Sequence, residues 1–320
     1  MSTQLALVLG ANGFIGSHVT VKLLEAGWRV RGFYRRLDPL LLTRFGHNNN
    51  FEAIEGSVTD EQVLCRALKG VSSVLCFTTF SFPATAPRTL QYELQTTLTA
   101  MEMLLRLMQR EGIPSLIFPS SGGTVYGDIG SRRALETDAL QPLSSYGMGK
   151  AICEEMIRFY NRIHNLQHCI LRISNVYGAP RIKRTLQGVI DVFLERLKAK
   201  QTLKVWGDLD IVRDYIFIDD LTDVIVKVLV AGKAPPQTMN VGSGIETTIR
   251  EVIRTIEEVT TIKCEYEIEN SNFSGIQHNV LDTSLLNNTY NWMPAYDLKA
   301  GIKKAWERKL KENETERIVR

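Results

Sequence analysis

The chain has 320 residues, of which 44% are hydrophobic and 23% are charged, and this composition excludes disorder as a description of the whole chain. The 38 lysines and arginines against 35 aspartates and glutamates give a net charge of +3, which is too small to predict a nucleic-acid or membrane partner. Because a single core rarely grows beyond ~250–300 residues, the length predicts two domains.

The opening segment and the cysteines predict a cytoplasmic protein. The first apolar run lacks a basic leader and a cleavage site, and no apolar run approaches the ~18 residues of a membrane span. The 5 cysteines form no CxxC pair and are typical of small hydrophobic residues in a reducing compartment. The 5 histidines show no HxH or HxxxH spacing, so we expect no metal site.

Short apolar runs alternate with helical patterns along the first half of the chain. In chain order, the patterns predict a strand over 4–9, a helix over 14–26, strands over 29–33, 51–54 and 73–77, a helix over 89–109, a strand over 115–119, a helix over 145–161 and a strand over 169–173. This alternation is typical of an α/β fold with a mostly parallel sheet that is covered on both faces.

The alternation loosens after about residue 178. A helix near 188–198 with short strands and loops is typical of a smaller lobe, and the charge-rich end over 303–320 predicts a solvated helix with a frayed tail. We therefore expect one domain over 1–178 and a second over 179–320, with some later segments returning to the sheet of the first.

Three glycines follow the first predicted strand at GxxGxxG spacing. A chain that leaves a strand, passes close to a pyrophosphate and starts a helix has no room for a Cβ at these steps. The N–H groups at the start of that helix also favour phosphate. The pattern predicts a dinucleotide-binding loop, and the alternative is a tight turn without a ligand. The residues expected to contact the dinucleotide are Gly10, Asn12, Gly13, Phe14, Ile15 and Gly16.

The end of the second predicted strand bears on the type of dinucleotide. The position that holds an acid when a free ribose 2′-hydroxyl is bound is Tyr34, and Arg35 and Arg36 follow it. Guanidinium groups suit a 2′-phosphate. We therefore expect NADP(H) to bind at least as well as NAD(H), and the alternative is two solvated surface arginines.

Tyr146 and Lys150 form a YxxxK pair on the helix that follows the fifth strand. Residues four apart lie on one face of a helix, and a nearby ammonium favours the phenolate form of a tyrosine. Such a tyrosine can exchange a proton with a sugar hydroxyl while hydride moves to or from a nicotinamide. The position of the pair, after the fifth strand and a Ser/Gly-rich loop, supports a catalytic role for it.

Several motifs in one order resemble a known family. They are GANGFIGSH at the start, SSGGTVYG at 120–127, SSYGMGK at 144–150, LRISNVYGAP at 171–180, VRDYIFIDDL at 212–221, and NVGSG at 240–244. The chain resembles the extended short-chain dehydrogenase/reductases, within them the NAD-dependent epimerase/dehydratase family of nucleotide-sugar enzymes. The resemblance implies a Rossmann domain with a smaller C-terminal α/β substrate-binding domain, a homodimer that uses the YxxxK helix, and a role in making polysaccharide precursors.

The resemblance also implies roles for single residues. Tyr146 is the expected acid/base, and Lys150 holds the nicotinamide ribose and favours the phenolate. Asn175 and Arg213 are expected at the phosphates of a nucleotide sugar, where a guanidinium suits the diphosphate. The segment from Val205 is expected at the nucleotide, where Trp206 either stacks on a base or is a core aromatic residue.

Some positions depart from the family pattern. The serine or threonine expected four residues before Tyr126 is Gly122. Thr124, Ser121 and Ser120 are the candidates to supply a hydroxyl to the sugar in its place. Ser57, followed by Val58, stands where the family places an adenine-contacting aspartate, and Asn272 stands where it places a second phosphate arginine. These departures leave the identity of the sugar open.

Three functions are compatible with these residues. The first is a nucleotide-sugar epimerase that oxidises its substrate transiently to a keto-sugar with a bound NAD or NADP. The second is an NADPH-dependent reductase of a 4-keto nucleotide sugar, which Arg35 and Arg36 favour. The third is a catalytically silent dinucleotide sensor, against which the intact Tyr146 and Lys150 argue.

Overall fold

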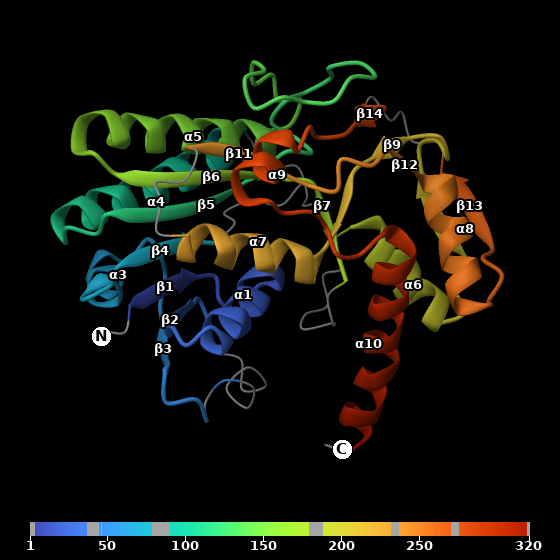
Figure 1. Ribbon diagram of the computed structural model, residues 1–320, viewed down its shortest axis with the longest axis horizontal. Helices are drawn as coiled ribbons and strands as arrows, with labels where there is room; N and C mark the ends of the chain where they lie inside the picture. The colour runs from blue at the N-terminus through green and yellow to red at the C-terminus, as the bar shows by residue number, and fades with distance from the viewer. Residues whose placement is uncertain are drawn as a thin grey trace. The chain divides into compact units, whose positions relative to one another are not determined.

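The computed structural model describes residues 4–36, 45, 47–78, 90–178, 188–231, 237–269 and 275–318 (Figure 1). The chain divides into two compact units. The first comprises Met1–Val125, Ala139–Arg172 and Thr222–Met239, and the second comprises Tyr126–Asp138, Ile173–Leu221 and Asn240–Arg320. No helix in the described ranges is both long and apolar enough to cross a membrane.

A seven-stranded sheet dominates the first unit, in the order β11-β6-β5-β4-β1-β2-β3. The strands are β1 (Leu5–Leu9), β2 (Arg29–Tyr34), β3 (Phe51–Glu55), β4 (Ser73–Cys76), β5 (Ser115–Ser121), β6 (Gln167–Ile173) and β11 (Thr238–Val241). β1 pairs in parallel with β2 and with β4, so the strand order reverses between β2 and β4. Doubly wound sheets bind ligands at the carboxyl ends of the strands beside such a reversal. The predicted Rossmann α/β fold is confirmed.

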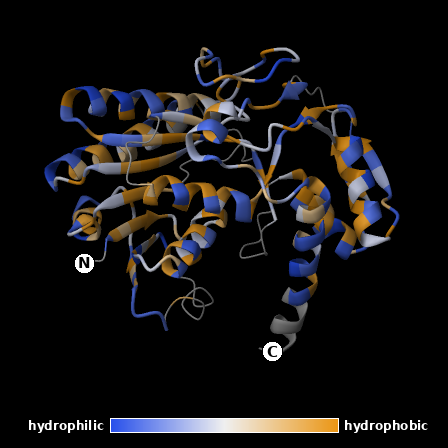
Figure 2. Ribbon diagram, viewed as in Figure 1, coloured by the Kyte–Doolittle hydropathy of each residue, from blue (hydrophilic) through white to orange (hydrophobic). Residues whose placement is uncertain are grey.

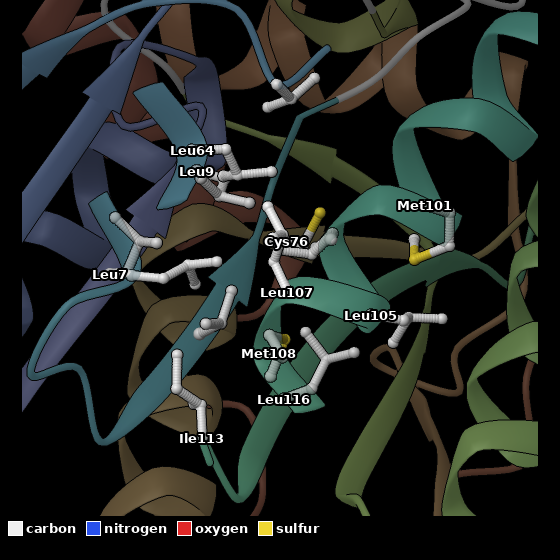
Figure 3. Packing of buried hydrophobic residues seen from close by; sticks show 14 of the residues in the cluster. Leu7, Leu9, Leu64, Cys76, Met101, Leu105, Leu107, Met108, Ile113 and Leu116 are labelled. Carbon is white, nitrogen blue, oxygen red and sulfur yellow. The ribbon is translucent and has the colours of Figure 1, made fainter. Parts of the chain in front are cut away.

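Helices cover both faces of this sheet. They are α1 (Phe14–Glu25), α3 (Glu61–Leu68), α4 (Leu90–Arg110), α5 (Ser145–His164) and α7 (Ile218–Val230) (Figure 1). Strand side chains alternate in direction, so Leu5, Leu7 and Leu9 share one face and join a core with side chains of α3, α4 and α5. Figure 3 shows Leu7 and Leu9 in this core. Ala6 and Val8 therefore point to the opposite face, on which α1 and α7 lie. The central strands are hydrophobic along most of their length (Figure 2), as expected for a sheet buried on both sides.

Two helices differ from the expectations. α3 was not predicted because it is only 8 residues long, and its start depends on Asp60, whose side chain accepts a hydrogen bond from the Val63 N–H. α10 (Leu298–Ile318) occupies the charge-rich end, but it is not solvated all round. Ile302 and Lys309 are fully buried within the second unit.

The second unit is built from short pairs of strands and from helices. β7 (Asn175–Tyr177) pairs in parallel with β10 (Tyr215–Phe217), and β8 (Leu203–Trp206) pairs in parallel with β13 (Tyr266–Glu269). β9 (Val212–Arg213) lies between β12 (Thr247–Thr248) and β14 (His278–Asn279). The remaining helices are α6 (Val189–Lys198), α8 (Ile249–Thr260) and α9 (Ser284–Tyr290).

Candidate functional site

The glycine loop joins β1 to α1 in the first unit. Gly10 has φ +79, and a Cβ on it would lie 2.9 Å from the Phe77 backbone carbon. A Cβ on Gly16 would lie 2.3 Å from the Gly10 carbonyl oxygen. Both positions therefore require glycine. In the described part of the chain no side chain caps α1 at Gly13, which leaves its first N–H groups for an anionic ligand. The loop fits a dinucleotide pyrophosphate.

The end of β2 lies against this loop. The Gly10 N–H donates to the Phe33 carbonyl oxygen at 3.0 Å, and Asn12 Nδ2 donates to the Arg36 carbonyl oxygen at 3.2 Å. Tyr34 is buried, and its hydroxyl covers Gly32, where a Cβ would lie 2.5 Å from it. Burial raises the pKa of Tyr34, so its hydroxyl stays neutral. The next residue, Arg35, was predicted to contact the cofactor, and its side chain is exposed.

Arg36 is exposed as well, and within the described residues neither arginine forms an ion pair. The end of β3 completes this edge, because the Gly56 N–H donates to the Tyr34 carbonyl oxygen at 2.7 Å. The Ser57 hydroxyl contacts the Thr59 hydroxyl at 2.7 Å, and the Val58 side chain joins the core. Val58 therefore offers only its backbone to a cofactor.

Tyr146 and Lys150 are held on the first turns of α5. Ser144 caps the helix, because its hydroxyl accepts from the Gly147 N–H at 3.1 Å. Lys150 is buried, and its Nζ donates to the Pro119 carbonyl oxygen at 2.7 Å. The same Nζ lies 5.9 Å from the centre of the Tyr146 ring. β5 and α5 thus bring the phenol and the ammonium together, as the YxxxK spacing predicts.

An aromatic ring and two thiols lie near the Lys150 ammonium. Its Nζ lies 4.6 Å from the centre of the Phe118 ring. Burial raises the pKa of Cys76 to about 11 and that of Cys153 to about 12, while the Lys150 ammonium draws both values down. Both thiols are therefore neutral at physiological pH. The ammonium has no carboxylate within salt-bridge distance among the described residues, so its charge remains available to a phenolate or a ribose hydroxyl.

The structure distinguishes the three hydroxyls that could serve in place of one at Gly122. The Ser120 hydroxyl is not available to a sugar, because it already donates to the Glu154 carboxylate at 2.5 Å. Thr124 Oγ1 is buried and has no hydrogen-bond partner within the described ranges. A Cβ on Gly147, the residue after Tyr146, would lie 2.7 Å from the Thr124 carbonyl oxygen. Thr124 therefore packs against the turn of α5 that carries Tyr146.

Ser121 closes the turn at the end of β5, because its carbonyl oxygen accepts from the Thr124 N–H at 3.1 Å. It is partly exposed, so its hydroxyl remains a second candidate.

In the second unit, Arg213 has no acidic counter-charge among the described residues. Its guanidinium donates only to carbonyl oxygens, including Ile276 at 2.7 Å and Val212 at 2.8 Å, and no carboxylate pairs with it among the described residues. Burial lowers the pKa of Arg213 from its usual value, but an arginine remains protonated in proteins. Such a guanidinium is suited to an anionic ligand.

The other predicted substrate residues differ in what they can offer. Asn175 Nδ2 donates to the Asp214 carbonyl oxygen at 2.9 Å, which leaves its amide oxygen for a ligand. The Val205 side chain is buried, so only its backbone can contact a nucleotide. Trp206 is 64% exposed and is therefore not a core aromatic residue. Asn272 lies outside the described residues.

Two residues beside Arg213 were missed in the sequence. Asp214 is fully buried, and its carboxylate accepts from the Ser243 N–H at 2.8 Å and the Gly244 N–H at 3.1 Å. Burial raises the pKa of Asp214, and these hydrogen bonds act in the opposite direction. A Cβ on Gly242 would lie 2.3 Å from this carboxylate, which explains the glycine of the NVGSG motif.

The second is Tyr215, whose buried hydroxyl has no partner among the described residues. It lies two residues after Arg213 and is paired in register with Asn175. Strand alternation from Arg213 was the signal that could have identified it. Buried hydroxyls are normally hydrogen-bonded, so Tyr215 is a candidate ligand contact.

Comparisons with known proteins agree with these features. A model of the NAD dependent epimerase/dehydratase family matches residues 6–242. The chain is 28% identical over 311 residues to a UDP-glucose 4-epimerase of Mycolicibacterium smegmatis, covering 94% of this chain and 97% of that protein. It is 28% identical over 304 residues to the dTDP-4-dehydro-6-deoxyglucose reductase of Escherichia coli, covering 93% and 95%.

The crystal structure of UDP-glucose 4-epimerase from Thermotoga maritima with UDP-glucose matches with a TM-score of 0.86 and 27% identity, covering 97% of this chain and 99% of that chain. The family model, which spans more than half of the chain, establishes membership. The protein is an enzyme of the NAD-dependent epimerase/dehydratase family.

Proposed function

We propose that the protein is a nucleotide-sugar epimerase that inverts a sugar hydroxyl through a transient keto-sugar, with a UDP-sugar as the substrate class and carbon 4 as the position inverted. The observation that carries the proposal is the arrangement in the first unit. Tyr146 lies beside the buried Lys150 ammonium, and the Thr124 backbone packs against Gly147, the next residue of the same helix. The Thr124 hydroxyl is buried and has no partner among the described residues. The relatives named as UDP-glucose 4-epimerases support the substrate class and the position.

In this proposal, each of three residues of the first unit has its own role in the reaction. Tyr146 takes the proton from the sugar hydroxyl that is oxidised and returns it when the hydroxyl is restored. Lys150 stabilises the phenolate, and the Thr124 hydroxyl orients the sugar oxygen. A nicotinamide cofactor held at the glycine loop would supply the hydride acceptor and donor for this chemistry. Since no net redox change occurs, the protein has no need to exchange its cofactor.

The second unit, taken by itself, carries groups suited to the diphosphate of a nucleotide sugar. Arg213 binds the diphosphate, because its guanidinium lacks a carboxylate among the described residues. The Asn175 amide and the Tyr215 hydroxyl, which are paired in register, bind polar groups of the same ligand.

The proposed function is tested by measuring epimerisation without added cofactor and the amount of cofactor that the purified protein retains. Freshly purified protein, incubated with UDP-glucose and no added nucleotide, is expected to form the 4-epimer until equilibrium is reached. Mass spectrometry of the nucleotide released on denaturation is expected to find NAD or NADP at close to one per chain. Turnover that requires a stoichiometric supply of reduced cofactor would contradict the proposal and support a reductase.

The reductase is the second candidate function, and a specific observation favours it. Arg35 and Arg36 are exposed beside the glycine loop without ion-pair partners among the described residues, and no acid stands at Tyr34. One relative of equal identity is named as a reductase of a 4-keto sugar nucleotide. A silent dinucleotide sensor is a weaker candidate, because Tyr146 and Lys150 are both in place.

Replacing Arg35 and Arg36 together by alanine tests whether they favour NADP(H), which carries a 2′-phosphate, over NAD(H). We expect the Kd for NADP(H) to rise about 10–100-fold while that for NAD(H) changes less than about twofold, because charge-assisted bonds to a 2′-phosphate are lost. Calorimetric titration with both cofactors measures the difference. Arg29→Ala, at the opposite end of β2, is the matched control. An equal change for both cofactors would show that the two arginines are solvated surface residues.

The homodimer that the resemblance implies stays a prediction. α5 carries exposed apolar side chains that could serve it, namely Met148, Phe159 and Ile163.

A further inference from the structure

Glu154 is a fully buried carboxylate on α5, one helical turn after Lys150. One of its oxygens accepts from Ser120 Oγ at 2.5 Å. The other accepts from Arg172 Nη2 at 2.8 Å and from Arg158 Nη2 at 2.7 Å. A carboxylate removed from water requires such partners. All four residues belong to the first unit, and none of them has a role in the mechanism proposed above.

Two adjacent contacts join α5 to the end of β5. Lys150 Nζ donates to the Pro119 carbonyl oxygen at 2.7 Å, and Glu154 holds the hydroxyl of the next residue, Ser120. Because residues 150 and 154 are four apart, they lie on one face of the helix and hold consecutive residues of the strand. Tyr146 is one turn earlier on the same face.

The end of β5 leads directly into the turn that presents the candidate hydroxyls. The Thr124 N–H and the Val125 N–H both donate to the Ser121 carbonyl oxygen, at 3.1 and 3.0 Å. Thr124 then packs against Gly147, as the close approach of 2.7 Å between its carbonyl oxygen and an added Cβ shows. Ser120 therefore directly precedes the turn that meets the first turn of α5.

A buried cluster of this kind is weak evidence for a purely stabilising role. A buried ion pair is often no more stabilising than well-packed apolar side chains of similar volume. A reacting group that is misplaced by ~1 Å can cost about 10²-fold in rate. Building on the proposed function, we propose that Ser120 and Glu154 are positioning residues, whose hydrogen bond holds the turn over 121–124 against Tyr146 in the geometry needed for turnover.

The Ser120→Ala variant tests this role, because Glu154 keeps both arginines and the ion cluster stays intact. We expect kcat for epimerisation to fall about 10–100-fold with KM within about twofold of wild type. The melting temperature and the amount of retained cofactor are expected to stay close to wild type. Ser120→Thr keeps the hydroxyl and suits a strand, so we expect it to retain most of the kcat.

Thr238→Val is the matched control. It removes a hydroxyl from the far side of the same cluster, where Arg158 Nη2 contacts Thr238 Oγ1 at 3.4 Å, and leaves the end of β5 untouched. Wild-type kcat in Ser120→Ala would overturn the positioning role. A loss of the same size in Ser120→Thr or in Thr238→Val, or a loss that follows the melting temperature, would overturn it as well.

Tyr146→Phe, measured in parallel, separates the two proposals. An active Tyr146→Phe enzyme would overturn the proposed function and, with it, the positioning role. An inactive Tyr146→Phe beside a fully active Ser120→Ala would overturn the positioning role alone.

Discussion

We expect Tyr146→Phe to lower kcat by about 10²–10⁴-fold, the usual contribution of a general acid or base, with KM nearly unchanged. Phenylalanine keeps the ring beside Lys150 and removes only the hydroxyl that exchanges the proton. The measurement is the initial rate of conversion of UDP-glucose into its 4-epimer, with the retained cofactor quantified in the same preparation.

Tyr160→Phe is the matched control for this substitution. Tyr160 lies on the same helix, where its ring packs against Phe159 with the centroids 6.0 Å apart. We expect this variant to keep wild-type kcat. Full activity of Tyr146→Phe would show that another group exchanges the proton, and the acid/base role would then be wrong.

The second large effect is expected at Arg213. Arg213→Met keeps a long apolar stem and removes the charge, so we expect KM for the nucleotide sugar to rise about 30-fold or more, because losing one partner of a buried charged contact costs ~2–5 kcal/mol. The kcat is expected to change little, since the diphosphate is bound equally in the ground state and the transition state. Initial rates over a wide range of substrate concentration separate the two constants.

Arg250→Met controls for the loss of a positive charge in the same unit. Arg250 forms an exposed pair with Asp210 at 3.0 Å, and its side chain is 58% exposed. Exposed pairs of this kind contribute little, so we expect both constants to stay close to wild type. If Arg213→Met lowers kcat without raising KM, the diphosphate role is wrong.

Most elements of the sheet could be predicted because their signals are local. β1 is a continuous apolar run that ends at Gly10, and α5 begins at a serine cap and carries its YxxxK pair on one face. α3 escaped detection because it is short and its start depends on the Asp60 cap. The burial of Lys309 on α10 escaped detection for a different reason, because the neighbours of a helix are not recorded in its own charge pattern.

The sequence by itself determined the glycine loop, the Tyr146 and Lys150 pair, and the family, because each depends on spacing within one segment. Only the tertiary structure decided which hydroxyl is available near Tyr146, since Ser120 is bound by Glu154, a residue 34 positions away, while Thr124 is left without a described partner. Spacing along the chain carries no information about which distant groups compete for one hydrogen bond. Packing brings those groups together, and burial then makes an unpaired hydroxyl or an unpaired guanidinium costly enough to indicate a ligand.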